Sequence, residues 1–176
     1  MDGNGLYSNY TLSTPLNIGS ARIRGFEINY QQQFSFLPGF WSGFGAFANY
    51  TYTDTQGDFG ALTTVKRLPQ LAPRNANAGV SYVKYGWQLR LLGNWRGLTY
   101  WGTSGPIDFY REARLILDTK IEYRFSRRYD LYLNVANITN EPIRSDVIRN
   151  EVLKKNLPWV MIKAGAACSA GVNVRL

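Results

Sequence analysis

The side chains in this chain that could best bind a ligand are charged residues at even-numbered positions in two segments. Seven of them are Arg90, Arg96, Arg114, Asp118, Lys120, Glu122 and Arg124. Such groups can bind an oppositely charged ligand, or they can pair with one another across neighbouring strands. We favour a ladder of cross-strand ion pairs, because a charged face by itself seldom identifies a ligand. The formal net charge of +8 makes the chain attractive to anions.

The groups that most enzymes use are missing from this chain. It contains no histidine, and its one cysteine, Cys168, can form neither an internal disulfide nor a paired zinc motif. We find no nucleophile motif and no pair of carboxylates spaced for acid–base work. The two acidic residues Asp54 and Asp58 lack the glycine and the distal glutamate of a calcium loop. We therefore expect no enzyme activity, no cofactor and no metal site.

The stretch from 111 to 142 shows how the charged residues are positioned. Odd-numbered residues there are mostly apolar, and they include Leu115, Leu117, Ile121, Tyr123, Leu131 and Leu133. This alternation with period two predicts a long β-hairpin with one apolar and one charged face. Phe125 and Tyr129 flank its charged turn. A hairpin of this kind is the repeating unit of an outer-membrane β-barrel.

The remaining segments repeat this pattern. We expect further strands over 20–36, 42–54, 73–84, 87–101 and 159–176, which makes about seven strands in total. The connections at 37–41, 84–87 and 126–129 are short, whereas those at 55–72, 102–110 and 143–157 are longer. Barrels of the outer membrane have short periplasmic turns and long extracellular loops, so this alternation assigns a sidedness to the chain.

The predicted fold class is therefore all-β: a transmembrane, antiparallel, up-and-down β-barrel, of which this chain forms a part. About seven strands are too few to close a bacterial barrel, which needs at least eight, and an open sheet in lipid leaves backbone groups unsatisfied at its edges. Two alternatives stay open at this point. One is a soluble β-sandwich that binds a ligand, and the other is a porin.

Four segments resemble the C-terminal part of the TonB-dependent outer-membrane receptors. "NIGSARIRGFEINY" resembles a recurrent strand of that family at Ala21, Gly25, Phe26 and Glu27. "FANYTYTDT" followed by "LPQLAPRNANAGVSY" is similar to its next strand, loop and strand. "LDTKIEYRFSRRYDLYLNVANITNEP" resembles a hairpin of the family, and "GAACSAGVNVRL" resembles its closing strand. The order and spacing of the four segments follow the family over nearly the whole chain.

The resemblance implies a fold, a location and a function. It implies that residues 1–176 are a C-terminal fragment of a barrel of about 22 strands in the bacterial outer membrane, without the plug domain and TonB box of the family. The expected function is active transport of a siderophore, vitamin or carbohydrate, with this chain as part of the barrel wall. The implied partners are outer-membrane lipid, the barrel-assembly machinery, a small-molecule ligand and, through the plug region, the TonB complex.

Two groups of residues become candidate sites in that setting. The aromatic residues Trp101, Phe109 and Tyr110 flank a loop expected outside the cell, where they could contact an incoming ligand or belong to the aromatic girdle of the barrel. The seven charged residues named above are expected to line the lumen. The basic segment 147–155 lacks aromatic residues for base stacking, so we expect no nucleic-acid partner.

Overall fold

The computed structural model describes residues 20–58, 67–104, 107–150 and 155–175. Nearly all of them belong to antiparallel strands. The strands are β1 (Ala21–Gln33), β2 (Phe44–Gly57), β3 (Arg74–Lys84), β4 (Trp87–Arg96), β5 (Thr99–Ser104), β6 (Ile107–Arg111), β7 (Arg114–Arg124), β8 (Tyr129–Ala136), β9 (Ile143–Asn150), β10 (Lys155–Ile162) and β11 (Ala167–Val174). A short 3-10 helix, η1 (Gly39–Gly43), lies between β1 and β2. None of the helices in these segments is long and apolar enough to cross a bilayer.

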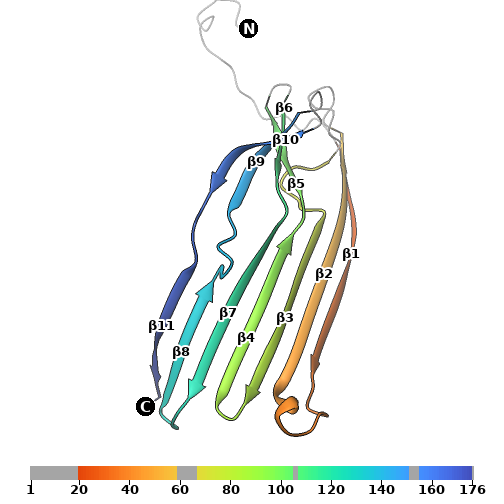
Figure 1. The fold of residues 1–176 in the computed structure, drawn as a ribbon. Coiled ribbons are helices and arrows are strands. Elements are labelled where there is room, and N and C mark those ends of the chain that lie inside the picture. Colours follow the sequence, from red (N-terminus) through yellow and green to blue (C-terminus); the bar gives the residue numbers. More distant parts are fainter. Residues whose placement is uncertain (1–19, 59–66, 105–106, 151–154, 176) are drawn as a thin grey trace, which may run out of the picture.

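Seven strands form one continuous sheet in the order β1-β2-β3-β4-β7-β8-β11 (Figure 1). Every neighbouring pair in this sheet is antiparallel. The predicted strands at 20–36, 42–54, 73–84 and the hairpin within 111–142 are confirmed, with ends that differ by a few residues. The last sheet strand begins at 167 and not at 159. The sheet is open, since β1 and β11 each have one edge without a neighbour among the described residues.

Two predicted loops instead form strands. The segment 102–110 belongs to the β5–β6 hairpin, and 143–157 belongs to the β9–β10 hairpin. These strands form a second, four-stranded sheet in the order β10-β9-β6-β5. The prediction of loops was wrong because polar composition does not exclude strand pairing, and in these hairpins the backbone groups pair with one another. In the third predicted loop, 55–72, β2 continues to Gly57, and residues 59–66 lie outside the described segments.

Two interruptions of the strands separate the two sheets. The predicted strand 87–101 ends at Arg96. The N–H of the next residue, Gly97, donates to the carbonyl oxygen of Arg74 at 2.8 Å, and the chain then continues into β5. The predicted strand 159–176 is likewise divided between β10 and β11. Gly165 lies in that break with φ of 79°, a conformation that favours glycine. These two breaks let the chain leave the main sheet and return to it.

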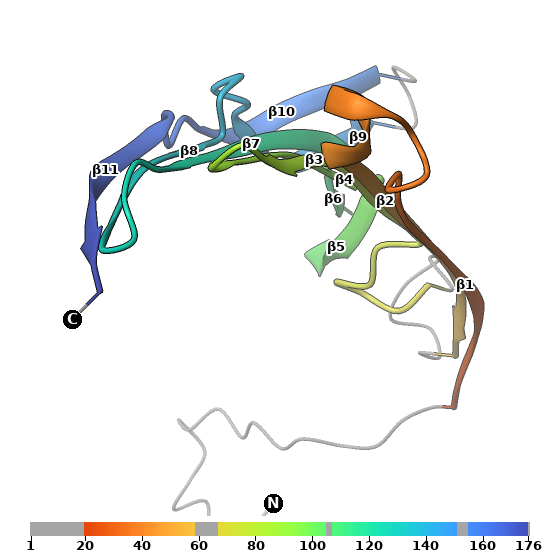
Figure 2. The same ribbon diagram turned by 90° about the horizontal axis from the view of Figure 1, so that it is seen from below.

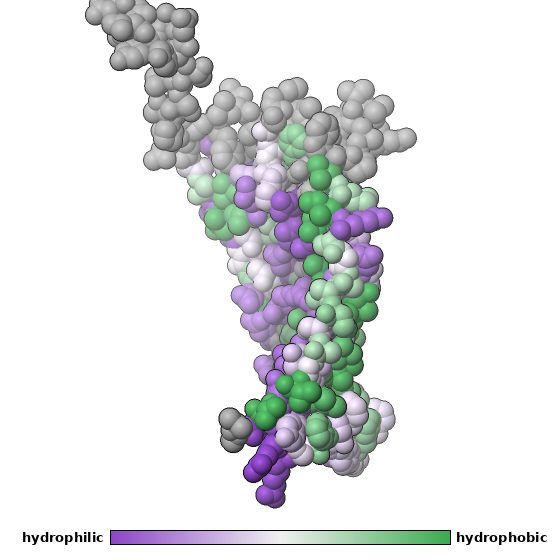
Figure 3. Space-filling view, turned by 90° about the vertical axis from the view of Figure 1, so that its left-hand side faces the viewer, coloured by the Kyte–Doolittle hydropathy of each residue, from purple (hydrophilic) through white to green (hydrophobic). Residues whose placement is uncertain are grey.

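The main sheet has two chemically different faces. Its pairing register places the odd residues of β4 beside the odd residues of β7, so that Leu91 lies opposite Thr119 and Leu89 opposite Ile121. Large apolar side chains on this face stay exposed, with Leu91 at 43% and Phe26 at 54%. Viewed from the edge, hydrophilic residues gather on one side of the sheet and hydrophobic residues on the other (Figure 3).

This distribution excludes a β-sandwich for the described residues. A soluble sandwich packs its apolar faces against each other, but the only buried hydrophobic residues described here are Tyr82 and Tyr100. The second sheet extends beyond the end of the main sheet and does not cover its apolar face (Figure 1). The apolar face therefore needs an apolar medium or a partner outside these segments.

The main sheet is curved like part of a cylinder wall (Figure 2). The hairpin strand β5 lies within the concave side, whereas η1 lies on the convex side. The helix belongs to the apolar face, since the ring of Phe40 packs against Tyr82 at 4.9 Å between centroids. The convex face is therefore apolar and the concave face polar, as expected for a barrel wall with lipid outside.

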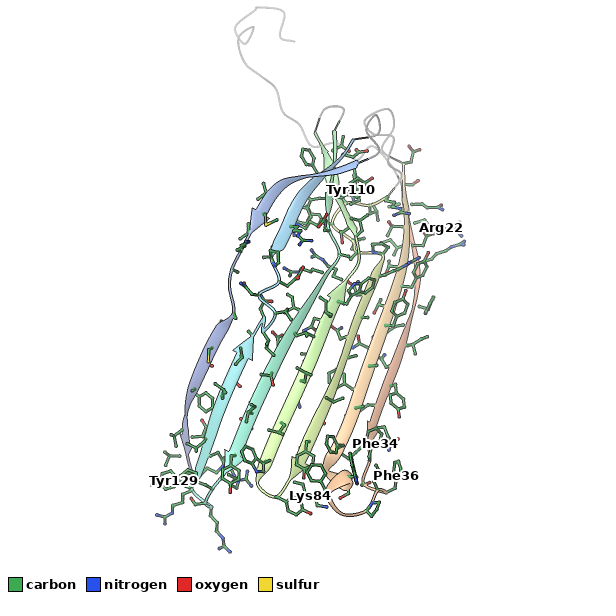
Figure 4. All side chains as sticks on the ribbon, viewed as in Figure 1. Arg22, Phe34, Phe36, Lys84, Tyr110 and Tyr129 are labelled. Carbon is green, nitrogen blue, oxygen red and sulfur yellow. The ribbon has the colours of Figure 1, made fainter. Side chains whose placement is uncertain are left out.

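The short turns lie together at one end of the sheet, which is also the end at which β11 finishes (Figure 1). Aromatic residues gather there, among them Phe34, Phe36 and Tyr129 (Figure 4). The turn between β3 and β4 has two residues with positive φ, Tyr85 at 55° and Gly86 at 82°, as a two-residue hairpin turn requires. The predicted clustering of short turns at one end is confirmed.

Adjacent leucines on β4 allow a test of the two faces. Leu91 lies on the apolar face, and Leu92 lies on the polar face opposite Asp118. We expect Leu91→Arg to lower the free energy of unfolding by about 2–4 kcal/mol in lipid, because it places a charge against the hydrocarbon. We expect Leu92→Arg to lower the free energy of unfolding by less than about 1 kcal/mol, because a charge on the polar face does not enter the hydrocarbon. Urea unfolding of the whole protein in lipid vesicles measures both, and equal losses would contradict this assignment.

Candidate functional site

The polar face carries all seven charged residues predicted to form a ladder. In the pairing of β4 with β7, Arg90 lies opposite Lys120, and Arg96 lies opposite Arg114. Both of these directly opposed pairs have like charges, which disfavours them unless other groups neutralise them. The seven residues therefore share a face, but only Lys120, Glu122 and Arg124 form ion pairs among the described residues, whereas Arg90, Arg96 and Arg114 form none. Their exposure to the lumen of a closed barrel stays a prediction.

The ion-paired residues lie toward the short-turn end. Lys120 Nζ is 2.7 Å from Glu122 Oε1 within β7. Asp130 on β8 binds two arginines, with 2.9 Å to Arg124 Nε and 2.7 Å to Arg175 Nη2. The Asp130 side chain is 12% exposed, so this ion triplet joins β7, β8 and the end of β11 in a partly desolvated position.

Asp118 has a different role from the other charged residues. Its Oδ1 accepts a hydrogen bond from the Asn137 backbone N–H at 2.8 Å, and its Oδ2 lies 3.5 Å from Asn94 Nδ2. Asn137 has a φ of 54°, and its amide group donates to the carbonyl oxygens of Glu141 and Gly165, both at 3.2 Å. Asp118 therefore stabilises the point at which the chain leaves β8 for the second sheet.

Two of the arginines without ion pairs lie at the other end of β4 and β7. Arg96 and Arg114 face each other there, and Arg111, from the end of β6, is near enough for its like charge to act on Arg96. None of the three forms a salt bridge with any described residue. The neighbouring carboxylate of Glu112 is instead bound to Arg144 at 3.3 Å.

Arg111 is held in place by an aromatic ring. The centre of its guanidinium group lies 3.2 Å from the centroid of the Trp101 ring. A cation over an indole face is attracted by the ring, and the hydrogen-bonding edge of the guanidinium group stays available. The Nε atoms of Arg96 and Arg111 are buried and have no hydrogen-bond partner. Buried donors without partners are rare in folded proteins, so these two require an explanation.

The three predicted aromatic contacts lie in strands rather than beside a loop. Trp101 belongs to β5, next to an irregularity in the β5–β6 pairing. Phe109 and Tyr110 belong to β6, where they pair with β9 through Ile148 and Val147. Figure 4 shows Tyr110 at the end of the sheet opposite the short turns. Their contact with a ligand stays a prediction.

A cavity of about 250 Å³ lies beside this hairpin. Its lining includes Thr53 and Thr55 from β2, Arg67 and Leu71 from the following segment, and Tyr100 from β5. The Leu68 N–H donates to Thr55 Oγ1 at 3.2 Å, and the Gln70 N–H donates to the Tyr100 carbonyl oxygen at 2.8 Å. These bonds join segment 67–73 to β2 and to the hairpin strand β5. No group of three or more acidic or cysteine side chains in the described segments could hold a metal ion.

The family model described as "TonB dependent receptor-like, beta-barrel" matches residues 2–138. This chain belongs to the TonB-dependent receptor β-barrel family. The family is located in the bacterial outer membrane. No curated protein matches the chain.

Among solved structures, the receptor chain is similar to the siderophore receptor PiuA from Acinetobacter baumannii. The identity is 15%, the TM-score is 0.61, and the match covers 90% of this chain. The chain spans 22% of the length of that protein. At this identity the likeness supports the fold, and it agrees with an open sheet that is one part of a larger barrel.

Sequence reasoning missed three residues of this site in the receptor. Arg111 was not predicted because its number is odd, unlike those of the seven charged residues, and because it directly follows a segment predicted as a loop. Asp130 and Asn137 lie in the predicted hairpin, and Asn137 also begins an Asn-x-Thr sequon that we attribute to chance. Asparagine adopts the left-handed conformation more readily than most residues, which is the local signal for its positive φ. Register and turn conformation, which alternation does not provide, would have identified them.

The ion triplet gives the first prediction for the receptor. Replacing Asp130 by alanine leaves two arginines without their shared acceptor, and we expect a loss of about 1–2 kcal/mol in stability, since both guanidinium groups are half exposed. Glu122→Gln breaks only the exposed pair with Lys120 and should cost about 0.5 kcal/mol or less. Urea unfolding in lipid, followed by tryptophan fluorescence, compares the two. Equal effects would show that the triplet is not a special contact.

The junction at Asp118 gives the second prediction. Asp118→Ala removes the acceptor of the Asn137 N–H and should destabilise the junction by about 1–3 kcal/mol. Hydrogen exchange measured by mass spectrometry should then show faster exchange over 137–141. Asp118→Asn keeps an acceptor oxygen and should restore most of the protection. Unchanged exchange in the alanine variant would refute the role of Asp118.

Proposed function

We propose that this chain forms part of the wall of an outer-membrane active transporter, in which ligand is bound at the outer end of the barrel and carried along its polar face. Family membership supports this proposal, together with the division of the sheet into an apolar convex face and a polar concave face. PiuA is a siderophore receptor, and we propose a siderophore, vitamin or carbohydrate as the class of ligand. Residues 1–176 then correspond to the C-terminal part of the barrel domain.

In this proposal the two ends of the sheet have different tasks. The short-turn end faces the periplasm, and its aromatic residues and ion triplet fix the wall in the membrane. The second sheet extends outside the cell, where Trp101, Phe109 and Tyr110 contact the incoming ligand. The proposed charged surface of the lumen consists of Arg90, Arg96, Arg114, Asp118, Lys120, Glu122 and Arg124.

The proposed partners follow from the same arrangement. Outer-membrane lipid covers the apolar face, and the barrel-assembly machinery inserts the sheet. The TonB complex supplies energy from the inner membrane by acting on a plug region, which is a part of the whole protein distinct from this sheet. The chain itself performs no chemistry in this scheme: it provides a wall, an entrance and a surface for the ligand. A porin would need no such energy, and the family match favours the receptor.

Uptake by cells that produce the whole protein tests this proposal. We expect accumulation of at least one member of a labelled panel of ferric siderophores, cobalamin and maltooligosaccharides, and we expect it to stop when TonB is deleted. Accumulation that continues without TonB would refute active transport and favour a porin.

The outer hairpin is tested separately with matched tryptophan variants. Trp101→Ala should weaken ligand binding about tenfold, since an aromatic anchor at a contact site contributes this much or more. Trp87→Ala alters a tryptophan at the short-turn end, where it packs against Tyr123 at 4.5 Å between centroids, and should leave affinity unchanged. Equal losses in both variants would show that Trp101 acts through stability and does not contact the ligand.

A further inference from the structure

Three arginines converge on the polar face where β4 and β7 meet the base of the outer hairpin. Arg96 and Arg114 are direct cross-strand neighbours, and Arg111 adds a third positive charge close to Arg96. Cross-strand neighbours of like charge repel each other, by an amount comparable to the gain from an opposite pair. Such an arrangement persists in a folded protein when something outside the three residues neutralises it.

The described part of the chain does not supply that neutralising group. Its ion pairs join Lys120 to Glu122, Arg144 to Glu112, and Asp130 to two other arginines, and none includes Arg96, Arg111 or Arg114. Asp130 on the same sheet, by comparison, holds two guanidinium groups. Arg96, Arg111 and Arg114 have no such shared acceptor among the described residues, although two of them are direct cross-strand neighbours.

The geometry of the three groups suits an anionic oxygen group. The indole of Trp101 covers one face of the Arg111 guanidinium group at 3.2 Å, which fixes its plane and leaves its N–H edge for an acceptor. The Nε atoms of Arg96 and Arg111 are buried without a partner, so donors are already desolvated before any ligand arrives. Guanidinium groups bind carboxylate and phosphate oxygens through two parallel hydrogen bonds.

We infer that Arg96, Arg111 and Arg114 form a binding site for an oxyanion of the carboxylate or phosphate class. This inference rests on the proposed function, because it places the site on the path of the transported ligand. The oxyanion comes either from that ligand or from an acidic side chain elsewhere in the whole protein. In both cases the anion neutralises the three charges and accepts hydrogen bonds from the guanidinium groups.

Isothermal titration of the purified whole receptor with citrate and with inorganic phosphate tests this inference. We expect binding of at least one of these anions, and we expect Arg96→Gln and Arg114→Gln each to weaken it about tenfold. Arg127→Gln is the control, since it removes the same charge from the short turn between β7 and β8, at the opposite end of the sheet. It should change affinity less than twofold. An equal loss in the control would overturn the site in favour of a general attraction by positive charge.

Thermal unfolding of the same variants distinguishes the two sources of the oxyanion. If the site is empty before ligand binds, Arg96→Gln relieves repulsion and should raise the midpoint of unfolding. If an internal carboxylate already occupies the site, the receptor should bind neither probe and Arg96→Gln should lower the midpoint, while Arg127→Gln should not. Absence of binding together with an unchanged or raised midpoint would overturn the inference.

These measurements separate this inference from the proposed function. Binding of the probes requires neither TonB nor transport, so binding without TonB-dependent uptake would refute the transporter and keep the oxyanion site. TonB-dependent uptake by a receptor that binds neither probe, and whose midpoint of unfolding is unchanged or raised by Arg96→Gln, would refute the site and keep the transporter. Heat-modifiable gel mobility of each variant confirms that it is folded before either result is used.

Discussion

The whole structure depends on one constraint: a backbone that crosses lipid must satisfy every N–H and C=O group internally. Extended strands satisfy this constraint only by pairing with neighbours, and the seven strands of the main sheet do so in a continuous antiparallel series. Pairing in turn fixes two faces, because side chains alternate. The apolar residues that a soluble protein would bury, such as Leu91 and Phe26, are here exposed on the convex face. In the proposed membrane setting, lipid takes the place of a protein core.

The polar face is electrostatically uneven, and this unevenness follows the axis of the sheet. Toward the short turns, charges are matched, as with Asp130 between Arg124 and Arg175. Toward the outer hairpin, Arg96 and Arg114 face each other without a described counter-ion. An ion pair that joins strands serves stability, whereas an uncompensated cluster costs stability and is expected where a ligand is bound. In the proposed transporter, one end of the sheet therefore serves anchoring and the other serves recognition.

The second sheet carries the residues that we propose for ligand contact. Strands β5 and β6 continue beyond β4 and β7, and β5 lies within the concave side of the main sheet (Figure 2). Trp101 of β5 stacks on Arg111 at the end of β6. The junction at Asn137, held by Asp118, leads in the same way into β9 and β10. In the proposed transporter, the residues for recognition are thus supported by hairpins with paired backbones, which is a firmer base than an irregular loop.

The sequence by itself determined the faces and the order of the main strands. Alternation with period two specifies which side of a strand each residue occupies, so Leu117 and Asp118 were assigned to opposite faces correctly. Alternation does not specify register, and it does not specify how a polar segment returns to the sheet. The opposition of Arg96 and Arg114, the approach of Arg111 from a segment predicted as a loop, and the triplet at Asp130 were therefore decided by the tertiary structure alone. The physical reason is that these contacts depend on hydrogen-bond pairing between segments distant in the chain, and local periodicity carries no information about that pairing.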